Sequence, residues 1–179
     1  LVGKEILAAQ LQQFFREELY NQGNEPDIHV PFLFARLGLP KETGSIVRSL
    51  ATESITHRYG GNDAYPTPFV GCAFVNQPRG YCPEMDEDDG AMSAWYVFAS
   101  IGMYPLVVGE AVYELFPPLF DKITLHLRAD RQTTVVIKVE GRTSEKQQLK
   151  KVTWNGKALP TFQIPVKELK KGGELVFKF

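Results

Sequence analysis

An acidic cluster at residues 84–89 has the clearest chemical potential in this sequence. It holds five carboxylates in six positions, directly before a predicted helix. The positive end of a helix dipole and a capping role, for instance by Asp89, account for one or two of them. Because adjacent carboxylates repel one another, the remaining ones predict that the cluster binds a cation or transfers protons.

A second polar cluster lies at residues 23–29, where a loop meets a predicted helix. It brings two carboxylates, an amide and an imidazole together, at Asn24, Glu25, Asp27 and His29. These groups supply hard oxygen ligands and hydrogen-bonding atoms to one small volume. The alternative is a turn in which Asp27 caps the helix and His29 packs inside it, and the spacing alone favours neither.

The sequence lacks the motifs that several other kinds of site require. An EF-hand beginning at Asp86 would need Gly at its sixth position and Glu at its twelfth, where the sequence has Ala91 and Val97. The chain has no Gly-x-Ser-x-Gly nucleophile motif and no phosphate-binding loop. Two carboxylate clusters with aromatic residues between them instead favour a sugar site, where rings pack on aromatic faces and a carboxyl pair moves protons.

The elements that must position these clusters are mostly helical in the first part of the chain. Apolar residues at three- and four-residue steps predict helices at residues 4–20, 28–37, 40–58 and 90–103. His57 is expected at a helix end, where the dipole favours it. Residues 60–90 have no regular period and are predicted to form a packed functional loop. We expect Cys72 and Cys82 to be buried thiols, with a disulfide as the alternative.

After residue 105 the pattern becomes that of strands. Residues 123–127, 134–139 and 174–179 are β-rich, and Asn155-Gly156 predicts a type I′ hairpin turn. The predicted fold class is therefore α+β, with a helical domain at 1–105 and a small antiparallel β domain at 106–179. Residues 1–120 contain 7 basic and 15 acidic residues, and residues 121–179 contain 13 basic and 6 acidic residues. The net charge of the whole chain is -1. This balance argues against nucleic-acid binding, and no stretch is apolar enough to span a membrane.

Several segments together resemble glycoside hydrolase family 92, the calcium-dependent exo-acting α-mannosidases. The resemblance covers nearly the whole chain and is carried by Gly-Asn-Glu-Pro-Asp at 23–27, the acidic-loop-to-Trp-Tyr box at 86–98, Gly-Met-Tyr-Pro at 102–105, Trp-Asn-Gly-Lys at 154–157 and Gly-Gly-Glu-Leu at 172–175. It implies helices of an (α/α)6 barrel followed by a β-sandwich. It also implies an inverting enzyme that acts on mannose-containing glycans with α-1,2 linkages expected and Ca²⁺ as cofactor.

The resemblance also implies roles for individual residues. Asp88 corresponds to the base that activates water, and Asp86 to an assisting carboxylate. Asn24 and Glu25 fall in the box that forms the calcium and sugar site. The same reasoning makes Asp27, His29 and Trp95 substrate-binding residues.

The resemblance further predicts a longer protein around this chain. The sequence begins Leu-Val-Gly without Met and lacks the family's general acid, a Glu in a Trp-Gln-Tyr motif. We therefore expect a C-terminal fragment that is inactive alone, packs against the missing N-terminal part or forms homo-oligomers, and belongs to a periplasmic or secreted protein. The alternatives are a non-catalytic calcium- or carbohydrate-binding module and a structural fragment without binding activity.

Overall fold

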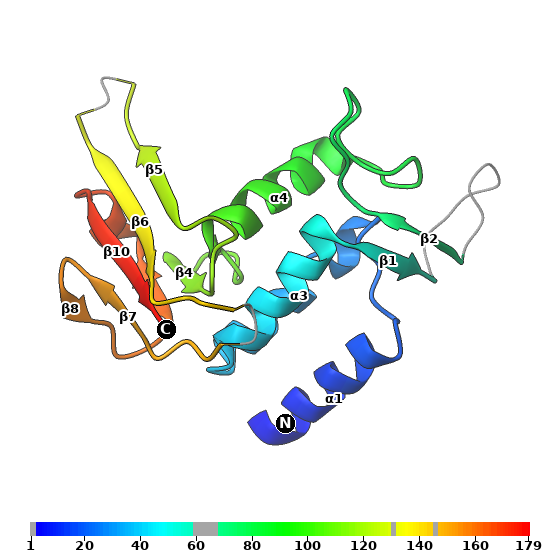
Figure 1. Cartoon of the computed structure of the whole chain (residues 1–179), viewed down its shortest axis with the longest axis horizontal. Coiled ribbons are helices and arrows are strands. Elements are labelled where there is room, and N and C mark those ends of the chain that lie inside the picture. Colours follow the sequence, from blue (N-terminus) through cyan, green and yellow to red (C-terminus); the bar gives the residue numbers. More distant parts are fainter. Residues whose placement is uncertain (1–2, 59–67, 130–131, 145–146) are drawn as a thin grey trace.

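A computed structural model describes residues 3–58, 68–129, 132–144 and 147–179. Helices α3 (Pro40–Thr52) and α4 (Ala91–Ile101) lie in the middle (Figure 1). A five-stranded sheet lies on one side of them, and the paired strands β1 (Ser54–His57) and β2 (Phe69–Cys72) lie on the other. The predicted mixture of helices and sheet is confirmed, while the (α/α)6 barrel and the sandwich stay predictions. Within the described ranges no helix has the length and apolar character needed to cross a membrane.

The helical elements of the first part are shorter than the sequence predicts. They are α1 (Lys4–Arg16), the 3₁₀ turns η1 (Glu25–Asp27) and η2 (Val30–Phe32), α2 (Leu33–Arg36), α3 (Pro40–Thr52), the 3₁₀ turn η3 (Asp88–Gly90) and α4 (Ala91–Ile101). The helix predicted to reach residue 20 ends at Arg16, because Glu18 adopts a left-handed φ of 55° and turns the chain. Tyr20 is thereby carried into the core.

A single helix over residues 28–37 is a wrong prediction. Pro31 lacks the N–H that a continuous helix requires, and the segment is divided into η2 and α2. Asp27 is also not the cap. The side chain of Asn24 caps η1 by accepting from the N–H of Glu25.

The helix predicted to reach residue 58 ends at Thr52. Residues Ser54–His57 form strand β1, which pairs antiparallel with β2 (Phe69–Cys72). The β-branched Ile55 and Thr56 favour this strand. The predicted aperiodic loop at 60–90 therefore contains a strand, and the two-residue alternation of that strand leaves Cys72 exposed, against the prediction. Cys82 is buried as expected, and both thiols are free.

The second part of the chain forms two sheets. Its elements are β3 (Met103–Tyr104), β4 (Val112–Leu115), β5 (Lys122–His126), β6 (Thr134–Glu140), β7 (Lys151–Trp154), β8 (Lys157–Ala158), β9 (Gln163–Pro165), α5 (Val166–Leu169) and β10 (Gly173–Lys178). The larger sheet has the order β5-β6-β10-β7-β8, and the smaller one β3-β4-β9.

The larger sheet is mixed and not purely antiparallel as predicted. Strand β10 lies between β6 and β7 and runs parallel to β6. The long connection between β6 and β10 makes this possible, because parallel neighbours need a crossover of a dozen or more residues. The hairpin turn is confirmed: Asn155 and Gly156 have the positive φ values, 48° and 79°, that a type I′ turn requires.

Two buried clusters make up the core. One contains Phe32, Val47, Met92 and Trp95 and lies under the helices, and the other lies against the larger sheet. Met103 belongs to the sheet cluster and Phe116 to the helical one, so the chain crosses between the clusters on both sides of residue 105. The domain boundary there stays a prediction.

Candidate active site

The acidic loop takes an unusual backbone conformation immediately before α4. Asp88 and Asp89 have φ values of 45° and 56°, and Gly90 follows at 92°. Most non-glycine residues avoid the left-handed region, whereas Asp and Asn enter it more readily because their short polar side chains can form local hydrogen bonds. The two successive left-handed residues turn the chain sharply and set the direction in which the side chains of Asp88 and Asp89 leave the backbone.

Glu87, and not Asp89, caps the helix that follows this loop. Its Oε1 accepts the N–H of Ser93 at 3.1 Å, and its carbonyl oxygen accepts the N–H groups of Gly90 and Met92. The stabilising role that the helix N-terminus offers to one carboxylate is therefore filled by Glu87. The carboxylates of Asp86 and Asp88 are left for other uses.

The polar turn at residues 23–27 is held by its own side chains. Asn24 Oδ1 accepts the N–H of Glu25 at 2.9 Å, and Asp27 Oδ2 accepts the N–H of Asn21 at 3.3 Å. Asn24 and Glu25 are exposed, while Asp27 is half-buried. Asp27 thus shapes the turn, and the side chains of Asn24 and Glu25 are exposed to solvent.

The two clusters meet in space. The N–H of Glu25 donates to Asp88 Oδ2 at 3.3 Å, across 63 residues of sequence. Nearby, the N–H of Asp86 donates to the carbonyl oxygen of Gly23 at 3.3 Å. The structure thereby brings the side chain of the predicted base, Asp88, and the backbone of Asp86 against the turn that carries the predicted sugar-binding residues.

Trp95 and His29 lie differently from the simplest expectation. The Trp95 side chain is buried, 1% exposed, and its indole N–H donates to the carbonyl oxygen of Ile28 at 2.8 Å. Its ring thus holds the polar turn against α4 and has no open face for a ligand. His29 is exposed beside the same turn and is free to reach a ligand there.

The buried Cys82 and His57 interact with Glu84, the half-buried first residue of the acidic loop, and sequence reasoning did not connect the three. Burial and a hydrogen bond to Glu84 raise the pKa of the Cys82 thiol to about 11. His57 was expected at a helix end, but it lies buried in β1 and stacks on Phe69 with ring centroids 4.2 Å apart. Burial lowers the pKa of His57, although Glu84 and the carbonyl oxygen of Gly71 oppose the shift.

The donor atoms around Asp88 match a hard cation in kind. Asn24, Glu25, Asp86 and Asp88 offer amide and carboxylate oxygens, which Ca²⁺ prefers. Among the described residues, however, no three His, Cys, Asp or Glu side chains gather closely enough to form a metal centre. These oxygens therefore fit part of a calcium shell, and other ligands would have to complete it.

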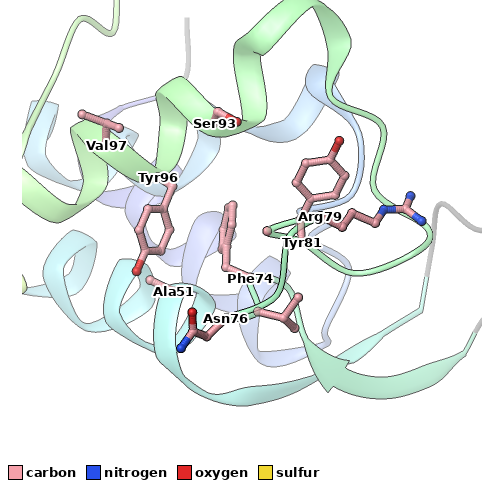
Figure 2. Close-up of a pocket in the computed structure, with 10 residues that line it drawn as sticks. Ala51, Phe74, Asn76, Arg79, Tyr81, Ser93, Tyr96 and Val97 are labelled. Atoms are coloured by element: carbon pink, nitrogen blue, oxygen red, sulfur yellow. The ribbon is translucent and has the colours of Figure 1, made fainter.

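A pocket of about 620 Å³ lies beside the acidic loop. Figure 2 shows Phe74 between Tyr96 and Tyr81, with Ser93 above and Asn76 below. Sequence reasoning placed aromatic residues in this segment without forming a pocket from them. The signal was the recurrence of Phe and Tyr in a stretch that is otherwise rich in Gly and Pro.

Comparisons with known proteins assign the chain to a family. The sequence model of the glycosyl hydrolase family 92 catalytic domain matches residues 1–63 and 69–179. No curated protein matches the chain in a sequence search.

Solved structures give the same result. The structure of the GH92 family glycosyl hydrolase ccman5 is 26% identical, with a TM-score of 0.85, over 98% of this chain and 25% of that one. A family GH92 alpha-mannosidase from Bacteroides thetaiotaomicron is 25% identical, with a TM-score of 0.73, over 98% of this chain and 22% of that one. A family GH92 inverting mannosidase from Bacteroides thetaiotaomicron VPI-5482 is 29% identical, with a TM-score of 0.64, over 87% of this chain and 18% of that one. The chain thus spans a quarter or less of the length of these structures, and its sequence and fold show that it belongs to glycosyl hydrolase family 92.

Proposed function

We propose that the protein removes terminal mannose from N-glycans or mannans by an inverting mechanism, with α-1,2 linkages as the expected class. The observation that carries the proposal is the contact between the N–H of Glu25 and Asp88 Oδ2. It joins Asp88, the expected base, to the turn at residues 23–27, which is expected to bind the sugar. Family membership supports the reaction class, and one similar structure is described as an inverting mannosidase.

Asp88 is the general base in this proposal. Its carboxylate takes a proton from a water molecule while the water oxygen bonds to the anomeric carbon, on the face opposite the departing oxygen. The N–H of Glu25 holds one carboxylate oxygen, and the other is left to accept the proton. The left-handed backbone at Asp88 fixes the direction of this side chain before the sugar arrives.

A second carboxyl group must protonate the departing oxygen. In inverting enzymes it lies about 6.5–9.5 Å from the base, which leaves room for the water. The family resemblance assigns this role to a Glu outside the 179 residues. Asp86, whose backbone is tied to Gly23, assists by adding negative charge where the sugar becomes cationic.

Calcium is the proposed cofactor of the same site. Asn24 and Glu25 would hold it through their exposed side-chain oxygens. When bound, the ion would supply a hard Lewis acid that binds neighbouring sugar hydroxyls. His29, exposed on the same turn, is placed to donate a hydrogen bond to the mannose. We propose the periplasm or the cell exterior as the compartment of the protein.

Proton NMR of a fresh reaction tests the mechanism. The full-length protein with an α-mannoside should release β-mannose first, and only later the equilibrium mixture of anomers. Removal of divalent ions with EDTA should lower the rate, and Ca²⁺ should restore it. Release of α-mannose first would contradict inversion, and a rate insensitive to EDTA would contradict the calcium site.

A further inference from the structure

The pocket beside the acidic loop has no part in the chemistry proposed above. Its volume of about 620 Å³ lies in the range of small-molecule sites. Its walls come from the segment after β2, which carries Phe74, Asn76 and Tyr81, and from the first turns of α4, which carry Ser93 and Tyr96 (Figure 2). Ala51 of α3 completes the lining, so three parts of the fold that the core holds together form the pocket.

The aromatic rings of the pocket are fixed in place. Phe74 stacks on the buried Trp95, with centroids 5.5 Å apart and planes 7° from parallel. The ring of Tyr96 lies 4.8 Å from that of Phe74 at an angle of 47°. Phe74 and Tyr81 also face each other in an antiparallel β-bridge. A ligand would thus meet preorganised apolar ring faces, which lowers the entropic cost of binding.

The charged group of the pocket is held by backbone carbonyl oxygens and by an aromatic ring. Arg79 is the charged residue among its described lining residues. Its guanidinium donates to the carbonyl oxygens of Pro83 at 2.6 Å and Met85 at 3.4 Å, and it lies over the ring of Tyr81. The other polar groups of the lining are neutral amide and hydroxyl groups. A ligand with hydroxyls and an apolar face, which describes a pyranose ring, suits this lining of aromatic rings, amide and hydroxyl groups.

The pocket is joined to the acidic loop on both sides. Arg79 bonds to the loop at Pro83 and Met85, and the N–H of Ser93 bonds to Glu87. Tyr96 lies about 4.5 Å further along α4 than Ser93, at 1.5 Å per residue. The pocket therefore begins where the loop that carries the proposed base ends.

We infer that this pocket is a glycan subsite. It binds a neutral pyranose ring further along the chain than the mannose that is cleaved, and so favours oligosaccharides over simple mannosides. The inference rests on the proposed function, because the acidic loop must hold the terminal mannose.

The test compares two substrates in the full-length protein. Tyr81→Ala and Asn76→Ala each should lower the ratio of kcat/KM for α-linked mannotriose to kcat/KM for 4-nitrophenyl α-mannoside by about tenfold. Phe120→Ala, an exposed ring outside the pocket, is the matched control and should change the ratio less than twofold. Asn76 lies on the surface, so its variant keeps the test valid if Tyr81→Ala misfolds. Unchanged ratios in both folded pocket variants would overturn the inference.

A binding measurement separates this inference from the proposed function. Calorimetric titration of Asp88→Asn protein with mannotriose should show binding, and adding Tyr81→Ala or Asn76→Ala should weaken it about tenfold. If these binding results are obtained but the wild-type protein does not hydrolyse α-mannosides, the proposed hydrolysis is refuted while the inference of a glycan subsite stands. If Asp88→Asn protein and the double variants bind mannotriose equally well, the subsite is overturned. The inference also fails if another part of the protein fills the pocket. In that case Tyr81→Ala or Asn76→Ala would lower the melting temperature without changing the binding of mannotriose.

Discussion

Replacing Asp88 with Asn tests the central assignment with little structural change. The amide oxygen of Asn still accepts the N–H of Glu25, and Asn tolerates the left-handed φ of 45° at this position. The substitution removes the negative charge and the ability to take a proton. It therefore separates the base from its supporting turn.

The expected loss of activity follows from the role of the base. General base catalysis contributes about 10²–10⁴-fold, so kcat should fall about 1000-fold, which corresponds to about 4 kcal/mol of transition-state stabilisation. The stability cost is far smaller. A 3.3 Å hydrogen bond that loses its charge assistance costs about 1 kcal/mol or less.

Asp89→Asn is the matched control for this experiment. Asp89 is the neighbouring residue, takes a similar left-handed φ of 56°, and loses the same charge, but its side chain is exposed. Hydrolysis of 4-nitrophenyl α-mannoside by the full-length protein should change less than threefold in this variant. Melting temperatures of both variants should stay within about 4 °C of the wild type.

Azide gives an independent readout of the same role. In Asp88→Gly, whose glycine suits the left-handed backbone, azide should restore part of the rate as a nucleophile that needs no base. The reasoning is refuted if Asp88→Asn keeps more than a tenth of the wild-type kcat, or if Asp89→Asn loses as much activity as Asp88→Asn.

Two further predictions concern the buried groups behind the acidic loop. Burial lowers the pKa of His57 in the folded protein below the value of about 6.5 expected in the unfolded chain. As the pH falls, the unfolded state therefore binds a proton at His57 before the folded state does. The free energy of unfolding should consequently decrease as the pH falls below about 6.5. His57→Phe should reduce the drop in melting temperature between pH 7 and pH 5, and an unchanged drop would show that other groups cause it. Cys72 is exposed and Cys82 is buried with a pKa of about 11, so iodoacetamide should label Cys72 in the folded protein and Cys82 only after denaturation. Equal labelling rates for the two thiols in the folded protein would contradict this burial.

Local pattern was sufficient for the elements whose signals do not depend on distant partners. The apolar spacing from Met92 to Ala99 and the left-handed Gly102 predicted α4, because one amphipathic helix carries its own period and its own stop. Asn155-Gly156 predicted its hairpin turn for a similar reason, since the two residues alone tolerate the backbone angles. Both predictions are confirmed.

Pairing between distant segments limited the remaining predictions. Residues 54–57 continue a helical spacing, yet they form a strand because β2 supplies a hydrogen-bonding partner that lies across residues 58–68. The position of β10 beside β6 likewise depends on which strands meet, and the alternation of β10 itself is the same in a parallel or an antiparallel pair. Strand pairing is a property of the assembled sheet, and neither segment records it alone.

The candidate site divides in the same way. The residue types at 23–29 and 84–89, and the family resemblance they carry, came from the sequence by itself, because carboxylates and amides show their chemistry without a fold. The tertiary structure decided which of them meet. It joined Glu25 to Asp88 across 63 residues, assigned Glu87 to the helix N-terminus and placed Trp95 in the core. The physical reason is that hydrogen-bond partners and burial depend on the packing of elements far apart in the chain.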